Sequence, residues 1–144
     1  MIKEKKIDFQ KIKDIIEKRG NVFNEETVYI LPEYSDNTDI LNEYTPDIYK
    51  ILKKHKIDVV VVKKNQHAYQ ALRDETIILP LILGIPFSIL SSLIYDWIKK
   101  SFSPSRLKIR VVTKDATGNY KEIQIEGTPN EVKESLIELE KKYE

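Results

Sequence analysis

Four side chains with the chemistry of ligands or acid–base groups follow two expected strands. Glu33, Asp36 and Asp39 lie in "PEYSDNTD", directly after the apolar run "ETVYIL", and His67 lies in "KNQHAY", after the valine run "DVVVVKK". Because the carboxyl ends of parallel strands meet at one edge of a sheet, we expect these side chains to gather there. Carboxylates and an imidazole serve as metal ligands or as acid–base pairs. The same residues also suit ordinary turns, and His67 also suits the start of a helix.

No catalytic motif accompanies these four residues. The sequence has no phosphate-binding loop, no G-x-G-x-x-G, no G-x-S-x-G and no H-E-x-x-H. Its 4 glycines are too far apart to form a glycine-rich cradle, and cysteine is absent. We therefore predict no catalytic residue, no metal and no cofactor, and we expect the chain not to be an enzyme. The alternative is an α/β enzyme with its site at the strand ends.

Residues 1–75 are expected to form an N-terminal α-β-α-β half. Asp8 suits the N-cap of a helix in "DFQKIKDIIEKRGN", and Thr45 suits the N-cap of a second helix in "YTPDIYKILKKHKI". Between and after these helices, "ETVYIL" and "DVVVVKK" predict two strands. A valine run of this kind is typical of a strand that is covered on both faces in a parallel sheet. The stretch "QHAYQALRDE" then predicts a short third helix.

Residues 103–144 are expected to form a ββα half. "RLKIRVV" and "YKEIQIE" alternate apolar with polar residues, and "KDATGN" between them suits a hairpin loop. "TPNE", from Thr128 to Glu131, is a capping-box pattern that predicts the start of the last helix. Because two strands alone are rarely stable, this half should pack on the rest of the chain. The fold class is therefore α+β, in one compact unit.

Residues 76–102 are expected to form an apolar helical segment that is broken at Pro86. No charged residue lies between Thr76 and Tyr95, although 33% of the chain is charged. Pro86 cannot continue a helix, and Gly84 just before it suits a helix end. After the break, the helix sorts its polar and apolar residues onto opposite sides. Its apolar side carries the candidate contact residues Phe87, Leu90, Leu93, Ile94 and Trp97.

Three interpretations of this segment remain open. Burial in the fold or in an oligomer interface ranks first, so the expected partner is another protein or a second copy of the chain. A membrane span over residues 77–98 ranks second, and insertion into a membrane surface ranks third. The expected location is cytoplasmic under the first interpretation and the bacterial inner membrane under the second.

The overall charge gives no general attraction to nucleic acid. The formal net charge is +1, from 24 basic and 23 acidic residues, and the basic runs lack interleaved aromatic residues. We therefore expect no nucleic-acid partner. The absence of cysteine suits a reducing compartment.

The second half of the chain carries a recognisable series of motifs. The helix "SILSSLIYDWIKK" ends in tryptophan and basic residues, the hairpin "KIRVVTKDATGNYKEIQIEG" follows, and a capped helix comes last. From Leu79 to Leu139 the chain resembles the effector-associated constant component family of bacterial conflict and antiviral defence systems. Trp97 and Gly118 match recognisable points, whereas Pro86 departs from the pattern. The resemblance implies a small, non-catalytic partner of a separate effector enzyme, so the leading hypothesis is a protein-interaction module.

Overall fold

The structure is a computed structural model that describes residues 2–35, 38–42, 44–62, 67–70, 76–99 and 105–143. For residues 33–35, 38–40, 67–70, 76 and 97–99 it describes the backbone only. In chain order, its elements are β1 (Ile2–Lys6), α1 (Phe9–Lys18), β2 (Val28–Leu31), β3 (Glu33–Ser35), β4 (Thr38–Asn42), α2 (Thr45–Lys54), β5 (Val59–Val61), β6 (His67–Gln70), β7 (Thr76–Leu83), α3 (Phe87–Lys99), β8 (Arg106–Lys114), β9 (Tyr120–Gly127) and α4 (Pro129–Tyr143).

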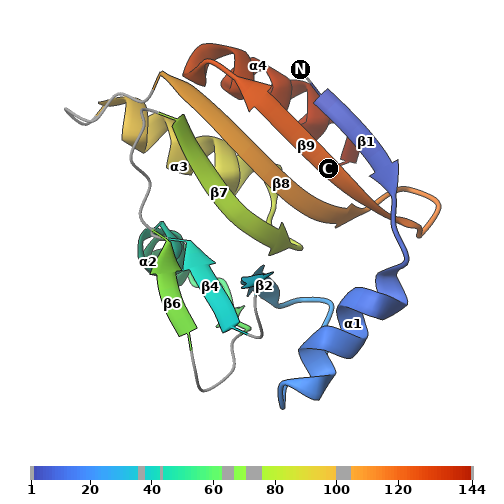
Figure 1. The fold of residues 1–144 in the computed structure, drawn as a ribbon. Coiled ribbons are helices and arrows are strands. Elements are labelled where there is room, and N and C mark those ends of the chain that lie inside the picture. Colours follow the sequence, from blue (N-terminus) through green and yellow to red (C-terminus); the bar gives the residue numbers. More distant parts are fainter. Residues whose placement is uncertain are drawn as a thin grey trace.

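Six strands form one mixed sheet in the order β1-β9-β8-β7-β2-β5 (Figure 1). The predicted parallel pair is confirmed, because β2 and β5 pair in parallel from Val28 opposite Val59. The predicted ββα half is also confirmed: β8 and β9 are antiparallel, and α4 follows. The α+β class is therefore correct.

The apolar segment is a strand followed by a helix, which corrects the expected pair of helices. Residues 76–83 form β7, the strand that joins the two halves, because β7 pairs with β8 on one side and β2 on the other. Pro80 lies inside this strand, where its missing N–H would normally break the ladder. The β7–β8 register shifts between Ile78 and Leu81, so a local irregularity accommodates the proline. A buried strand and a buried helix share the same uninterrupted apolar pattern, which is why the sequence predicted a helix for residues 76–83.

The predicted break between Gly84 and Phe87 is confirmed. Gly84 has φ +86°, a left-handed conformation that favours glycine, and its N–H donates to the Val112 carbonyl at 2.9 Å. The helix α3 then begins at Phe87. Residues 77–98 thus do not form one continuous helix. Among the described residues, no helix has both the length and the apolar character needed to cross a bilayer.

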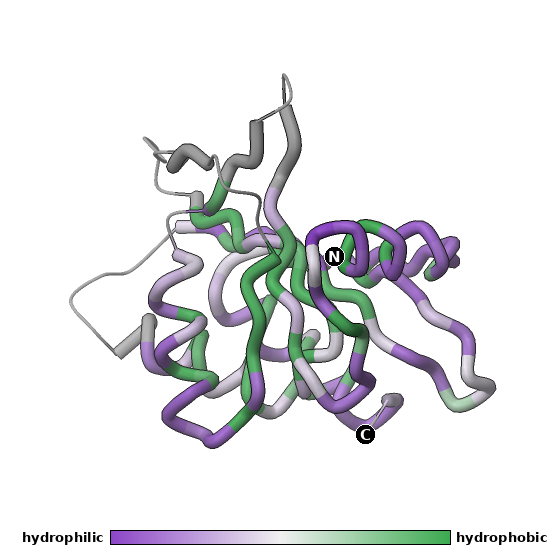
Figure 2. The backbone as a smooth tube through the Cα atoms, turned by 90° about the horizontal axis from the view of Figure 1, so that it is seen from below, coloured by the Kyte–Doolittle hydropathy of each residue, from purple (hydrophilic) through white to green (hydrophobic). Residues whose placement is uncertain are grey.

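Three of the described helices, α2, α3 and α4, cover one face of the sheet. Figure 1 shows α3 and α4 lying behind the long strands β7, β8 and β9. The main core between them contains buried residues from these strands and helices, among them Ile82, Leu90, Ile109, Ile125 and Leu136. Figure 2 shows the hydrophobic residues concentrated along the central strands and the hydrophilic residues along outer helices and turns.

A single helix, α1, packs on the opposite face. Asp8 caps it as predicted by accepting a hydrogen bond from the Gln10 N–H at 3.1 Å. Phe9 stacks on Tyr120, with 3.7 Å between ring centroids, and Ile16 is fully buried. This second core lies over β2, β5 and the adjoining ends of β7 and β8, and contains Tyr29, Leu31, Val62, Leu83 and Val112.

The N-terminal strand β1 was not expected from the sequence. It pairs antiparallel with β9, with Ile2 opposite Ile125. Four of its five residues are exposed, so the strand has little apolar signal beyond Ile2. The strand forms because β9 offers it backbone hydrogen-bond partners, although the local sequence has no strand pattern.

Candidate interaction surface

The structure brings together part of the predicted ligand cluster. The two segments expected to meet at the strand ends form a three-stranded sheet in the order β3-β4-β6. Its register places Asp39 opposite His67, whereas Glu33 lies opposite Ile40, the next residue along β4. Within the segment expected to be a third helix, His67–Gln70 instead form the strand β6, and the rest of that segment lies outside the described residues.

The chemistry of this cluster stays a prediction. Asp36 lies outside the described residues, and only the backbone is described at Glu33, Asp39 and His67. Among the residues whose side chains the structure places, no group of three or more acidic, histidine or cysteine residues could hold a metal ion.

Four of the five candidate contact residues of α3 are buried in the core, as the first interpretation of the apolar segment predicted. Phe87, Leu90, Leu93 and Ile94 are each at most 1% exposed. They pack on the sheet and on α4, because the apolar side of α3 turns inward. The side chain of Trp97 lies outside the described residues. The first interpretation of the segment, burial in the fold, therefore holds for these four side chains.

A different surface remains uncovered within the described structure. On β8 and β9 every second residue is buried toward α3 and α4, so the intervening residues lie on the opposite face. The second core beneath α1 covers the part of that face over β2, β5 and the adjoining ends of β7, β8 and β9, where Leu81, Val112 and Tyr120 belong to it. The uncovered part extends over β1, β9 and β8, and we call it the open face. Its residues are Lys3, Lys5, Lys108, Arg110, Glu122, Gln124 and Glu126.

The sheet register arranges these side chains in rows across the strands. Lys3 lies opposite Gln124, Gln124 lies opposite Arg110, and Arg110 lies opposite Leu81 of β7. Lys5 lies opposite Glu122 in the next row. Basic side chains therefore occupy the β1 and the β8 positions of this row.

Along β7, the border of the open face is apolar. Lys108 lies opposite Glu126 on one side and Ile78 on the other. Ile78 and Leu81 are half-buried, although most of their neighbours in β7 are fully buried. The open face thus joins a charged area to a partly exposed apolar strip on β7.

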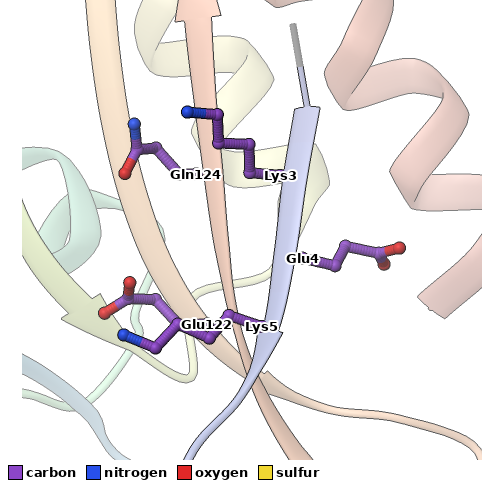
Figure 3. Close-up of a pocket in the computed structure, with 5 residues that line it drawn as sticks. All are labelled: Lys3, Glu4, Lys5, Glu122 and Gln124. Carbon is purple, nitrogen blue, oxygen red and sulfur yellow. The ribbon is translucent and has the colours of Figure 1, made fainter.

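A depression of about 440 Å³ lies at the β1 side of the open face. Figure 3 shows Lys3, Lys5, Glu122 and Gln124 extending to the same side of the two strands, whereas Glu4 extends to the other side, toward α4. The lining of the depression consists of two lysines, two glutamates and one glutamine. It therefore offers charged and hydrogen-bonding groups beside the aliphatic parts of these side chains.

The strand β1 that carries the two lysines is fixed to the last helix. The Glu4 carboxylate accepts hydrogen bonds from the Tyr143 hydroxyl and from Lys142 Nζ. These two bonds, that from Tyr143 first, hold the pKa of Glu4 below its usual value. Burial and the bond to Glu4 raise the pKa of Tyr143, so its hydroxyl stays protonated and donates. Lys3 and Lys5 therefore lie on a strand whose middle residue, Glu4, is hydrogen-bonded to α4.

The β1 edge of the six-stranded sheet is charged. It carries Lys3, Glu4, Lys5 and Lys6, and lysines on an edge strand disfavour pairing with another chain. The β5 edge consists of three valines, of which Val59 is buried and Val60 and Val61 are half-buried. The open face is thus a better candidate for an interaction surface than the β1 edge.

Sequence reasoning found the alternation of β8 and β9 but did not find the open face. The signal for Lys108 and Arg110 was present in "RLKIRVV". Residues 2–6 contain one apolar residue, Ile2, followed by four charged ones. They therefore lack the alternation of apolar and polar residues that predicts a strand.

Comparison with known proteins assigns no family, because no family model, no curated protein and no solved structure matches the chain.

Proposed function

We propose that the protein is a non-catalytic interaction module. The observation that carries this proposal is the open face, together with the half-buried Ile78 and Leu81 beside it. A polar sheet face alone is ordinary, since antiparallel sheets commonly turn one face to water. An apolar strip that continues into a charged area is the usual composition of a protein interface, with a hydrophobic centre and a polar rim.

The class of partner follows from the resemblance of residues 79–139 to the effector-associated constant component family. We propose that the module acts as an adaptor or partner of a bacterial defence effector, and that the complex forms in the cytoplasm. The apolar side of α3, which lies within the region of that resemblance, has a structural role here, because it packs on the sheet. Partner binding is therefore assigned to the other face of the sheet.

Genes adjacent to the coding sequence provide the test. Each neighbouring protease, nuclease or nucleotide-signalling enzyme would be co-expressed with the tagged full-length chain. We expect one of them to co-purify and to elute with the chain as a complex of defined stoichiometry in size-exclusion chromatography. If each candidate elutes separately from the chain at micromolar concentration, the adaptor proposal is wrong.

A second candidate function, an α/β enzyme or ligand-binding protein, is favoured by one observation. The register pairs Asp39 with His67, two residues singled out as ligands from the sequence. Calorimetric titration with Zn²⁺ or Mn²⁺ tests it, with His67→Ala as the variant and His55→Ala, an exposed histidine after α2, as the control. This candidate requires binding that His67→Ala abolishes and His55→Ala retains.

A further inference from the structure

We infer that the open face binds an acidic segment of a protein partner, an inference that rests on the proposed interaction function. The first argument is charge. The open face carries four basic residues, Lys3, Lys5, Lys108 and Arg110, against two carboxylates, Glu122 and Glu126. The chain as a whole is nearly neutral, with a net charge of +1, so this excess is local. A local excess of cations attracts and orients an acidic partner.

The second argument separates a protein partner from other polyanions. Glu122 lies opposite Lys5, and Glu126 lies opposite Lys108 and forms an ion pair with Arg106 at 3.9 Å. A phosphate backbone or an anionic lipid surface presents negative charge throughout, so it would meet these carboxylates with repulsion. A protein segment can place carboxylates against the lysines and a cation or hydroxyl against the glutamates. The alternating charges of the open face therefore favour a protein.

The third argument is the geometry of the row from Lys3 to Leu81. Neighbouring strands lie about 4.8 Å apart, so the three steps of this row span roughly 14 Å. Along that distance the row presents an exposed cation, an amide, a second cation and a half-buried leucine. A complementary segment crosses the strands with carboxylates at the β1 and β8 positions and an apolar side chain over β7. Such a segment would lie beside α1 and complete the helical layer on this face.

The test uses a short synthetic helical peptide with glutamates at i and i+7, about 10 Å apart along the helix, and a leucine roughly one turn beyond the second glutamate. Its partner peptide has lysines in place of the glutamates. Amide chemical shifts of the isotope-labelled full-length protein locate the binding site of each peptide. We expect the acidic peptide to shift amides of β1, β9 and β8, with little effect from the basic peptide. Binding should weaken as salt concentration rises.

Charge-reversal variants make the test specific to the open face. We expect Lys3→Glu with Lys5→Glu to weaken binding of the acidic peptide by about tenfold, and the neutral pair Lys3→Gln with Lys5→Gln to have an intermediate effect. The matched control is Lys50→Glu with Lys54→Glu, two exposed residues of α2 that give the same change in net charge. This control should change the affinity by less than about twofold.

Several results would overturn the inference. They are shifts confined to other surfaces, equal binding of both peptides, equal weakening by the α2 control, or preferential binding of single-stranded DNA or phosphatidylglycerol vesicles. Binding experiments with the co-expressed effector distinguish a failure of this inference from a failure of the proposed function. An effector that still binds the Lys3→Glu/Lys5→Glu variant as tightly as the unchanged protein overturns only the location of the surface. If the unchanged protein binds no effector, the adaptor proposal is wrong. The amide shifts that the peptides induce then test on their own whether the open face binds an acidic segment.

Discussion

Lys142 in the last helix donates hydrogen bonds to both oxygens of Glu4 in the first strand, each at 3.0 Å. The two residues are 138 positions apart, so this contact joins the two ends of the chain. It also orients the strand that carries Lys3 and Lys5, because Glu4 lies between them on the opposite face (Figure 3).

The Glu4 contact predicts a pH-dependent contribution to stability. The pKa of Glu4 is lowered in the folded state, first by the Tyr143 hydrogen bond and then by Lys142. The contribution is therefore present above the ordinary pKa near 4.5 and is lost as pH falls through the lower folded value. We expect Glu4→Gln to lower the free energy of unfolding by about 1 kcal/mol at neutral pH, and by progressively less in acid. Urea unfolding at a series of pH values measures the difference, and a constant difference over that series would contradict the prediction.

Ser91 predicts a stabilising substitution. Its Oγ is buried in α3 and has no hydrogen-bond partner among the described residues. Removing a buried, unpaired hydroxyl should raise the free energy of unfolding, so we expect Ser91→Ala to stabilise the protein by about 1 kcal/mol. The control is Ser92→Ala, because the exposed Ser92 Oγ donates to the Ser88 carbonyl at 3.1 Å. Both changes gain the same helix propensity, so a thermal unfolding experiment that ranks the two variants equally would count against this reading.

Gly84 predicts a destabilising substitution at the junction of β7 and α3. With φ at +86°, an alanine there is strained, and its Cβ would meet the Thr27 carbonyl oxygen at 3.4 Å. Gly20 is the control, since its φ is +85° and no atom lies within 4 Å of an added Cβ. Each alanine should cost about 1–2 kcal/mol from backbone strain, with the larger loss at Gly84. Denaturant midpoints compare the variants, and an unchanged midpoint for Gly84→Ala would mean that the junction adopts another conformation.

Leu90 distinguishes burial in the fold from exposure to a partner or to lipid. It is 0% exposed, so Leu90→Ala should lower the free energy of unfolding by roughly 2–5 kcal/mol. Ile137 on α4 is 44% exposed, and Ile137→Ala should cost less than about 1 kcal/mol. Chemical unfolding in the absence of detergent or partner measures both. If Leu90→Ala proves as mild as Ile137→Ala, the apolar side of α3 is not packed on the sheet.

Local patterns in the sequence were sufficient for several elements. Asp8 and the Thr128–Glu131 capping box marked the starts of α1 and α4, and the structure contains both caps. These signals are reliable because a cap satisfies backbone groups within a few residues. Thr45 is a partial exception, since α2 begins at Thr45 but the capping position belongs to Tyr44, and the Thr45 hydroxyl is buried without a partner among the described residues.

The sequence by itself determined the α+β class, the parallel β2–β5 pair, the ββα half and the break after Gly84. Only the tertiary structure decided that residues 76–83 are a strand, because an apolar run satisfies burial equally well as helix or strand until a neighbour offers backbone hydrogen bonds. It likewise decided the strand at Ile2–Lys6, which depends on the edge of β9 more than one hundred residues away. The open face is decided in the same way: Lys3, Gln124 and Arg110 share a row only through strand pairing, which no local pattern encodes.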